Sequence, residues 1–172
     1  MTRLPRTAAT TLVLWCLLTV AARDGSAQPR IPDKISGYGA YRFGMTIAEA
    51  RRAEPSAAEI KCDYVGTASC LEQQSVFFGE QARVTALFAD TDKRLNKVNI
   101  TFDRLQGTEG ACGKGVKTIL DALFRRFGEP TKSEPRRAFW YATEGGEIHL
   151  MNMCIDDDLG LFVVSYSPSA SF

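Results

Sequence analysis

Residue types that build catalytic and metal sites are scarce in this chain of 172 residues. His149 is the only histidine. A serine or cysteine nucleophile that needs histidine as its base would have to use this one side chain, and no Gly-x-Ser-x-Gly motif accompanies it. The cysteines show no C-x-x-C spacing, which is typical of zinc sites. We therefore expect a protein that is not an enzyme and that has no cofactor and no metal ion.

The chain also lacks an excess of charge and a long apolar run. Its 21 Lys and Arg oppose 20 Asp and Glu, which leaves a formal net charge of +1. That balance gives no basic surface for nucleic acid. The longest uncharged run, residues 7–22, has 16 residues, whereas a membrane-spanning helix needs about 20 apolar residues. We therefore expect neither nucleic-acid binding nor stable membrane insertion.

Residues 1–27 have the three parts of a secretory signal peptide. Arg3 and Arg6 give a positive start, residues 7–22 form the apolar centre, and Gly25-Ser26-Ala27 supplies the small residues that signal peptidase accepts. Cleavage after the last of these would release the mature protein into the periplasm or the medium. A retained membrane anchor is the alternative interpretation.

Four cysteines follow this segment, and an even number in an exported chain predicts two disulfide bonds. Cys62 and Cys70 flank the flexible segment 66–69, and Cys112 and Cys154 lie in the second half of the chain. Four cysteines allow three pairings. We favour Cys62–Cys70 together with Cys112–Cys154.

Two segments have helix signals. Residues 46–53 begin with a Thr-x-x-Glu capping box, in which each side chain satisfies a free backbone N–H of the first turn. Apolar residues within 116–127 recur at spacings of 0, 3, 4, 7, 8 and 11, which is typical of an amphipathic helix, and Gly128 ends it. We expect the glycine-rich residues 107–115 to form a loop before this second helix.

Alternating apolar and polar residues predict strands between and after the helices. The expected strands cover residues 60–65, 71–78, 84–89, 98–102, 138–143, 147–154 and 161–167.

A shift of 64 residues aligns apolar positions of the two halves, which indicates a duplication. The aligned residues are Val98 with Phe162, Ile100 with Val164, and Phe102 with Tyr166. We therefore predict an α+β fold in which two helix-plus-three-strand repeats form one antiparallel sheet with both helices on one face. The first repeat with its N-terminal arm would cover residues 28–105, and the second would cover residues 106–172.

Three short motifs carry a family resemblance. Gly44-Met45-Thr46, Phe127-Gly128-Glu129-Pro130 and the strand with Trp140 resemble the pattern of small outer-membrane assembly lipoproteins. The doubled helix-plus-meander with one disulfide in each half is similar to the β-lactamase-inhibitory-protein fold. The resemblance implies a fold that is used to bind proteins, with no inherited chemistry. The chain lacks a lipobox, so the resemblance does not extend to lipid attachment.

The strand pattern also predicts a partly apolar second face of the sheet. If Ile148 and Leu150 point to the core, alternation places His149 and the neighbouring methionines on the opposite face. The expected partner-contact residues are Trp140, His149, Met151, Met153 and Val163. A sheet face of this kind with no helix over it marks a partner surface. The alternative is closure of that face by the arm at 28–43 or by the loop between Cys62 and Cys70.

These observations predict an exported protein-binding module without catalytic activity, of which an inhibitor is one form. Its partner would be an envelope or extracellular protein. A structural or assembly-accessory protein of the envelope is the alternative, and an enzyme of unrecognised type is the third class.

Overall fold

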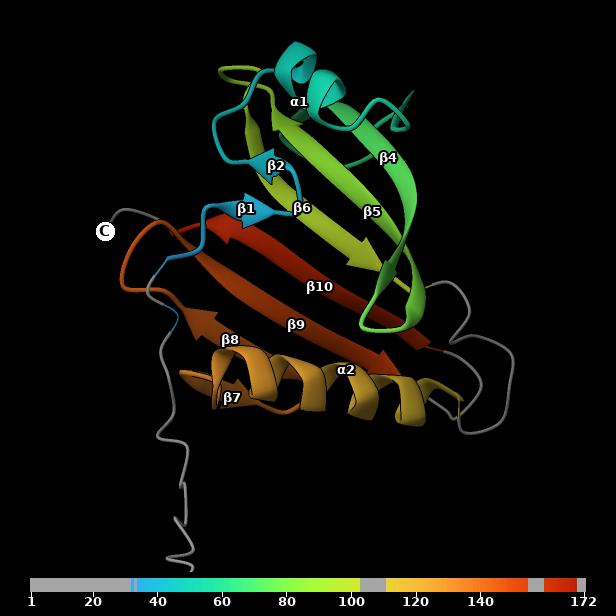
Figure 1. Cartoon of the computed structure of the whole chain (residues 1–172), viewed down its shortest axis with the longest axis vertical. Coiled ribbons are helices and arrows are strands. Elements are labelled where there is room, and N and C mark those ends of the chain that lie inside the picture. The colour runs from blue at the N-terminus through green and yellow to red at the C-terminus, as the bar shows by residue number, and fades with distance from the viewer. Residues whose placement is uncertain (1–31, 33, 103–110, 155–159, 170–172) are drawn as a thin grey trace, which may run out of the picture.

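The computed structural model describes residues 32, 34–102, 111–154 and 160–169, and most of this part of the chain is β-structure (Figure 1). Among these residues, the elements in chain order are β1 (Gly37–Tyr38), β2 (Tyr41–Arg42), α1 (Ile47–Ala53), β3 (Ala58–Ile60), β4 (Thr67–Phe77), β5 (Glu80–Ala89), β6 (Leu95–Thr101), α2 (Ala111–Phe127), β7 (Lys132–Glu134), β8 (Arg137–Tyr141), β9 (Gly146–Cys154) and β10 (Gly160–Pro168).

One eight-stranded sheet forms the body of the molecule. Its strand order is β3-β4-β5-β6-β10-β9-β8-β7, and each neighbouring pair is antiparallel. The two halves of the chain meet where β6 pairs with β10, and Ile100 lies opposite Val164 at this join. The remaining two strands, β1 and β2, form a separate small hairpin.

Local sequence signals account for both helices. The predicted capping box of α1 is confirmed, because the Thr46 backbone N–H donates to Glu49 Oε2 at 2.8 Å and the Glu49 N–H donates to Thr46 Oγ1 at 3.3 Å. The end of α2 is also as predicted: Gly128 has φ +76° and donates its N–H to the Phe124 carbonyl at 2.8 Å.

The start of α2 differs from the prediction. Gly113 and Gly115, which we expected in a loop, lie within the helix. A helical glycine costs about 1 kcal/mol relative to alanine. The apolar stripe that follows packs on the sheet through Ile119 and Leu123, and this burial offsets the cost. Residues 107–110 of the predicted loop lie outside the described residues.

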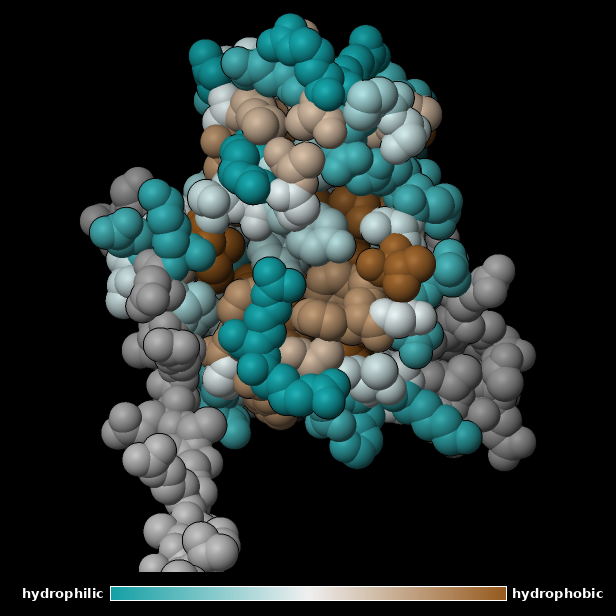
Figure 2. All heavy atoms as spheres, in the orientation of Figure 1, coloured by the Kyte–Doolittle hydropathy of each residue, from teal (hydrophilic) through white to brown (hydrophobic). Residues whose placement is uncertain are grey.

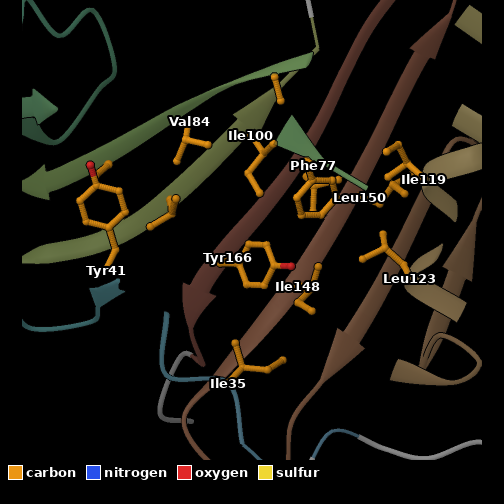
Figure 3. Close-up of a cluster of buried hydrophobic side chains, with 14 of the residues drawn as sticks. Ile35, Tyr41, Phe77, Val84, Ile100, Ile119, Leu123, Ile148, Leu150 and Tyr166 are labelled. Carbon is orange, nitrogen blue, oxygen red and sulfur yellow. The ribbon is translucent and has the colours of Figure 1, made fainter. Parts of the chain in front are cut away.

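One face of the sheet, here called the inner face, carries the hydrophobic core. The residues that the sequence predicted for it are buried there: Val98, Ile100, Phe102, Ile148, Leu150, Phe162, Val164 and Tyr166. Figure 3 shows side chains from both halves of the sheet meeting those of α2, among them Ile119 and Leu123. Directly opposed residues on paired strands share a face, so the core runs continuously across the β6–β10 join.

The N-terminal segment covers a further part of the inner face. Ile35 and Tyr41 are buried in the core, and Tyr38 packs against it. The Ile35 N–H donates to the Glu144 carbonyl at 3.2 Å, which ties this segment to the turn before β9. Figure 1 shows β1 and β2 in front of the sheet, and Figure 2 shows apolar side chains gathered between this hairpin and α2.

The predicted fold class, two helix-plus-three-strand repeats with both helices on one face, is wrong. Each half instead contributes four consecutive strands to a mostly β molecule. The missed strand β7 is short and polar and lies at an edge, so it carries no apolar alternation. The seven-residue α1 lies at one end of the sheet (Figure 1) and buries only Ala50, so it does not cover the face as α2 does.

The β6–β10 join should be a major determinant of stability. We predict that Ile100→Ala lowers the free energy of unfolding by about 2–4 kcal/mol, because it removes a fully buried side chain and leaves a cavity. The exposed Val76→Ala is the matched control, with an expected change of about 0.5 kcal/mol or less. Urea denaturation followed by circular dichroism measures both. Equal losses for the two variants would contradict the role assigned to this join.

Candidate functional site

The second face of the sheet, here called the outer face, has its own rows of side chains. One row crosses the sheet from Glu72 through Thr85, Asn99, Ser165 and His149 to Phe139, because each residue lies opposite the next on a paired strand. The parallel row runs through Arg83, Thr101, Val163, Met151 and Arg137. The packed elements α1, α2 and the β1–β2 hairpin all contribute to the core of the inner face.

Three of the predicted contact residues lie on this outer face. His149 and Met151 are half-buried, and Val163 is 9% exposed. Val163 lies opposite Thr101 on one side and Met151 on the other. Met153 belongs to β9, but its side chain lies outside the described ones.

Trp140 does not lie on the outer face, so its assignment as a partner-contact residue is wrong. It lies opposite Ile148, is fully buried on the inner face and donates its indole N–H to the Gly128 carbonyl at 2.9 Å. Three successive aromatic residues, Phe139, Trp140 and Tyr141, hide the alternation of this strand in the sequence. Packing of the indole ring near Phe124 on α2 decides which face each one occupies.

Phe139 and Tyr141 are the outer-face aromatics that sequence reasoning missed. The Phe139 ring stacks on the His149 imidazole with centroids 4.4 Å apart and planes 7° apart. It also stacks with Tyr141, with centroids 6.0 Å apart, and Lys132 Nζ lies 5.7 Å from its centroid. The signal that could have found them is the pairing of their strand with the one that contains His149.

The centre of the outer face is polar and internally hydrogen-bonded. Ser165 Oγ donates to Asn99 Oδ1 at 2.8 Å across the β6–β10 join. Thr85 Oγ1 donates to Glu72 Oε2 at 3.4 Å, and this carboxylate also lies 3.9 Å from the Arg83 guanidinium. These contacts hold the polar side chains between the aromatic end of the face, at Phe139 and Tyr141, and the end that carries Cys70.

The predicted Cys62–Cys70 disulfide is confirmed and shapes that opposite end. Cys70 lies opposite Leu87 on the outer face, and both are buried. The loop that the disulfide closes exposes Tyr64 and Val65, at 47% and 105%. The sequence left open whether this loop or the arm at 28–43 covers the outer face. The disulfide loop lies at one end of the outer face, so it covers that face only in part.

The arm at 28–43, by contrast, does not cover the outer face with its described residues, because Ile35, Tyr38 and Tyr41 pack on the inner face. The second predicted disulfide remains a prediction, since the side chains of Cys112 and Cys154 lie outside the described ones.

Burial and a neighbouring cation disfavour a charged imidazole on this face. Desolvation is the main reason that the pKa of His149 lies below its ordinary 6.5. The Arg137 guanidinium lowers this pKa further, whereas the Glu147 carboxylate raises it. The Nε2 atom is buried, and within the described part of the chain no group forms a hydrogen bond with it. His149 is therefore neutral at pH 7, which suits an aromatic stack.

Within the described ranges, no group of three or more His, Cys, Asp or Glu side chains is placed to hold a metal ion. In the same ranges, no helix combines the length and the apolar character that crossing a bilayer requires.

Comparison with known proteins gives no relative for this arrangement: no family model, no curated protein and no solved structure matches the chain. The resemblance to the assembly lipoproteins and to the β-lactamase-inhibitory-protein fold therefore stays a prediction from the sequence.

The lone histidine provides a direct test of the electrostatics. Because its folded pKa lies below 6.5, the unfolded chain binds more protons at that site as the pH falls from 6.5 toward the folded pKa. We predict that stability is greatest above pH 6.5 and falls across this window. His149→Phe, which keeps an aromatic ring in the stack, should flatten the slope. The imidazole Hε1 signal in NMR gives the pKa directly, and a midpoint at or above 6.5 would show the site to be solvated.

The disulfide loop provides a second test. The double variant Cys62→Ser with Cys70→Ala should lower the free energy of unfolding by about 2–3 kcal/mol, because a short closed loop no longer restricts the unfolded chain. Chemical denaturation under oxidising conditions measures this loss without disturbing the other cysteines. An unchanged midpoint would mean that the disulfide adds nothing to the stability of the folded chain.

Proposed function

We propose that the chain is an exported, non-catalytic protein-binding module and that a folded protein partner docks on the outer face. The observation that carries the proposal is the stack of Phe139, His149 and Tyr141 beside Met151, on a face that α1, α2 and the β1–β2 hairpin leave uncovered. An aromatic and methionine surface on a sheet is typical of the centre of a protein–protein interface.

The size of the face is adequate for a specific interface. Eight strands at a spacing of about 4.8 Å give a sheet about 34 Å wide, and the seven residues of β6 extend about 20 Å along its axis. The area is then roughly 700 Å², close to the roughly 800 Å² that each partner contributes to an interface of standard size.

The composition of the face also fits a protein partner. Charged groups of both signs, among them Lys132, Arg137 and Glu147, surround the aromatic stack. A mixed polar rim around an apolar centre is the usual anatomy of a non-obligate interface. Nucleic acid would instead call for a surface of one sign.

The face is pre-organised for binding. The hydrogen bond between Ser165 and Asn99 and the disulfide-closed loop fix side chains at the centre and at one end of the face. Ordering such groups before binding reduces the entropy lost on association. The exposed Tyr64 and Val65 extend the contact area at the end far from the aromatic stack.

Export is part of the proposal. It rests on the signal-peptide pattern of residues 1–27, which lie outside the described residues, and on the disulfide between Cys62 and Cys70. Disulfides persist in the oxidising compartments that exported proteins reach.

The central test is Met151→Asp. The residue is half-buried and lies opposite Arg137, so the new carboxylate should leave the fold intact. We expect partner capture to weaken tenfold or more, which is about 1.4 kcal/mol. Thr118→Asp, which adds the same charge on the exposed side of α2, is the matched control and should bind as the wild type does. Quantitative pull-down with circular dichroism of each variant measures both properties.

The outcomes separate the interpretations. A single soluble partner in one-to-one ratio, retained by Thr118→Asp and lost by Met151→Asp, supports the proposal. Equal capture by both variants would place the interface elsewhere. Sedimentation of all three proteins with membranes would favour a structural role in the envelope, and unfolding of Met151→Asp would show that the outer face is not an open surface.

A further inference from the structure

A cavity of about 400 Å³ opens on the inner side of the molecule, far from the rows of the outer face. Its walls come from the segment around β1, from the C-terminal end of α2 and from β10 (Figure 1). The side chains that matter are those of Lys34, Tyr38, Arg42, Arg126, Phe127 and Tyr166. This volume is within the range of sites for small molecules.

The wall of the cavity carries three cations. Among the described residues, Lys34, Arg42 and Arg126 line it and no acidic side chain does. Within the described part of the chain, none of the three forms an ion pair. Glu54 acts electrostatically on Tyr38 but is not part of the wall. Positive charges gathered without a counter-charge favour an anion between them.

Three aromatic residues, Tyr38, Phe127 and Tyr166, also line the wall. The rings of Tyr38 and Tyr166 lie with centroids 5.3 Å apart, and the Arg126 guanidinium lies 5.3 Å from the centre of the Phe127 ring. Tyr166 is almost completely buried, which raises the pKa of its phenol and keeps it protonated. Flat apolar surface and cations therefore occur side by side, which suits a ligand with an aromatic body and one negative group.

The part of the wall that the β1–β2 hairpin forms is held by contacts within the protein. Arg42 donates hydrogen bonds to the carbonyls of Gly39 and Tyr41 and is thereby held in the β1–β2 hairpin. At Gly37, with φ +146°, an added Cβ would lie 2.0 Å from the Tyr41 carbonyl oxygen, so only glycine permits this hairpin. Since Ile35 is also tied to Glu144, the segment forms a defined wall.

We propose that this cavity is a binding site for a small aromatic carboxylate. The carboxylate would lie among Lys34, Arg42 and Arg126, and the ring would contact Tyr38 and Phe127. This site is separate from the proposed protein-binding face, so one of the two proposals can fail without the other.

The test uses the purified protein and 2-naphthoate as the probe, with isothermal titration calorimetry as the readout. We expect saturable one-to-one binding, and roughly fivefold or greater weakening when the neutral 2-naphthylmethanol replaces the carboxylate. Arg126→Gln should weaken naphthoate binding by a similar factor. Arg125→Gln is the matched control, because the neighbouring arginine is exposed on the same helix but does not line the cavity, and its affinity should stay within about twofold of the wild type.

Three results would overturn the proposal. They are no saturable heat with naphthoate at millimolar concentration, equal affinity for the charged and neutral probes, and equal weakening by Arg125→Gln and Arg126→Gln. Met151→Asp should bind naphthoate as the wild type does. Circular dichroism of Arg126→Gln, whose side chain is exposed, checks that the variant retains the fold.

Discussion

The pairing of β6 with β10 is the contact on which the rest of the structure depends. It joins the last strand of the first half to the last strand of the second half, in antiparallel register with Ile100 opposite Val164. Each half alone would be a four-stranded meander with an exposed hydrogen-bonding edge at a strand that buries apolar side chains. The join removes both edges at once and leaves only the three-residue strands β3 and β7 at the borders of the sheet.

The same register gives the two faces of the sheet different chemistry. Side chains of one parity form a core that continues from Val84 through Ile100 and Val164 to Leu150. Side chains of the other parity form the outer face, where Asn99 and Ser165 meet across the join. A shift of one residue in this pairing would exchange the faces, so the register that stabilises the core also creates the proposed binding surface.

The inner face requires more than its helices. α2 covers the second half of the sheet, but α1 is short and lies at one end, so Ile35 and Tyr41 from the N-terminal segment fill the core instead. Where this segment passes the end of α2, the fit leaves a cavity lined by cations from both. The proposed anion site is thus a consequence of covering a wide sheet with two elements that are distant in the sequence.

The sequence by itself determined the features that depend on neighbours along the chain. The capping box at Thr46 and Glu49, the stop at Gly128, the buried positions of β6 and β10, and the closure of the short loop between Cys62 and Cys70 all follow from residues close together. The outer-face positions of His149 and Met151 follow from alternation next to Ile148 and Leu150. Only the tertiary structure decided the strand count, the face that Trp140 occupies and the side that the N-terminal segment covers. The polar β7 is a strand because β8 pairs with it, and Trp140 points inward because α2 packs there. Ile35 is buried where its segment is hydrogen-bonded to Glu144 in the turn before β9. Each of these outcomes depends on a partner far away in the sequence, which no local pattern encodes.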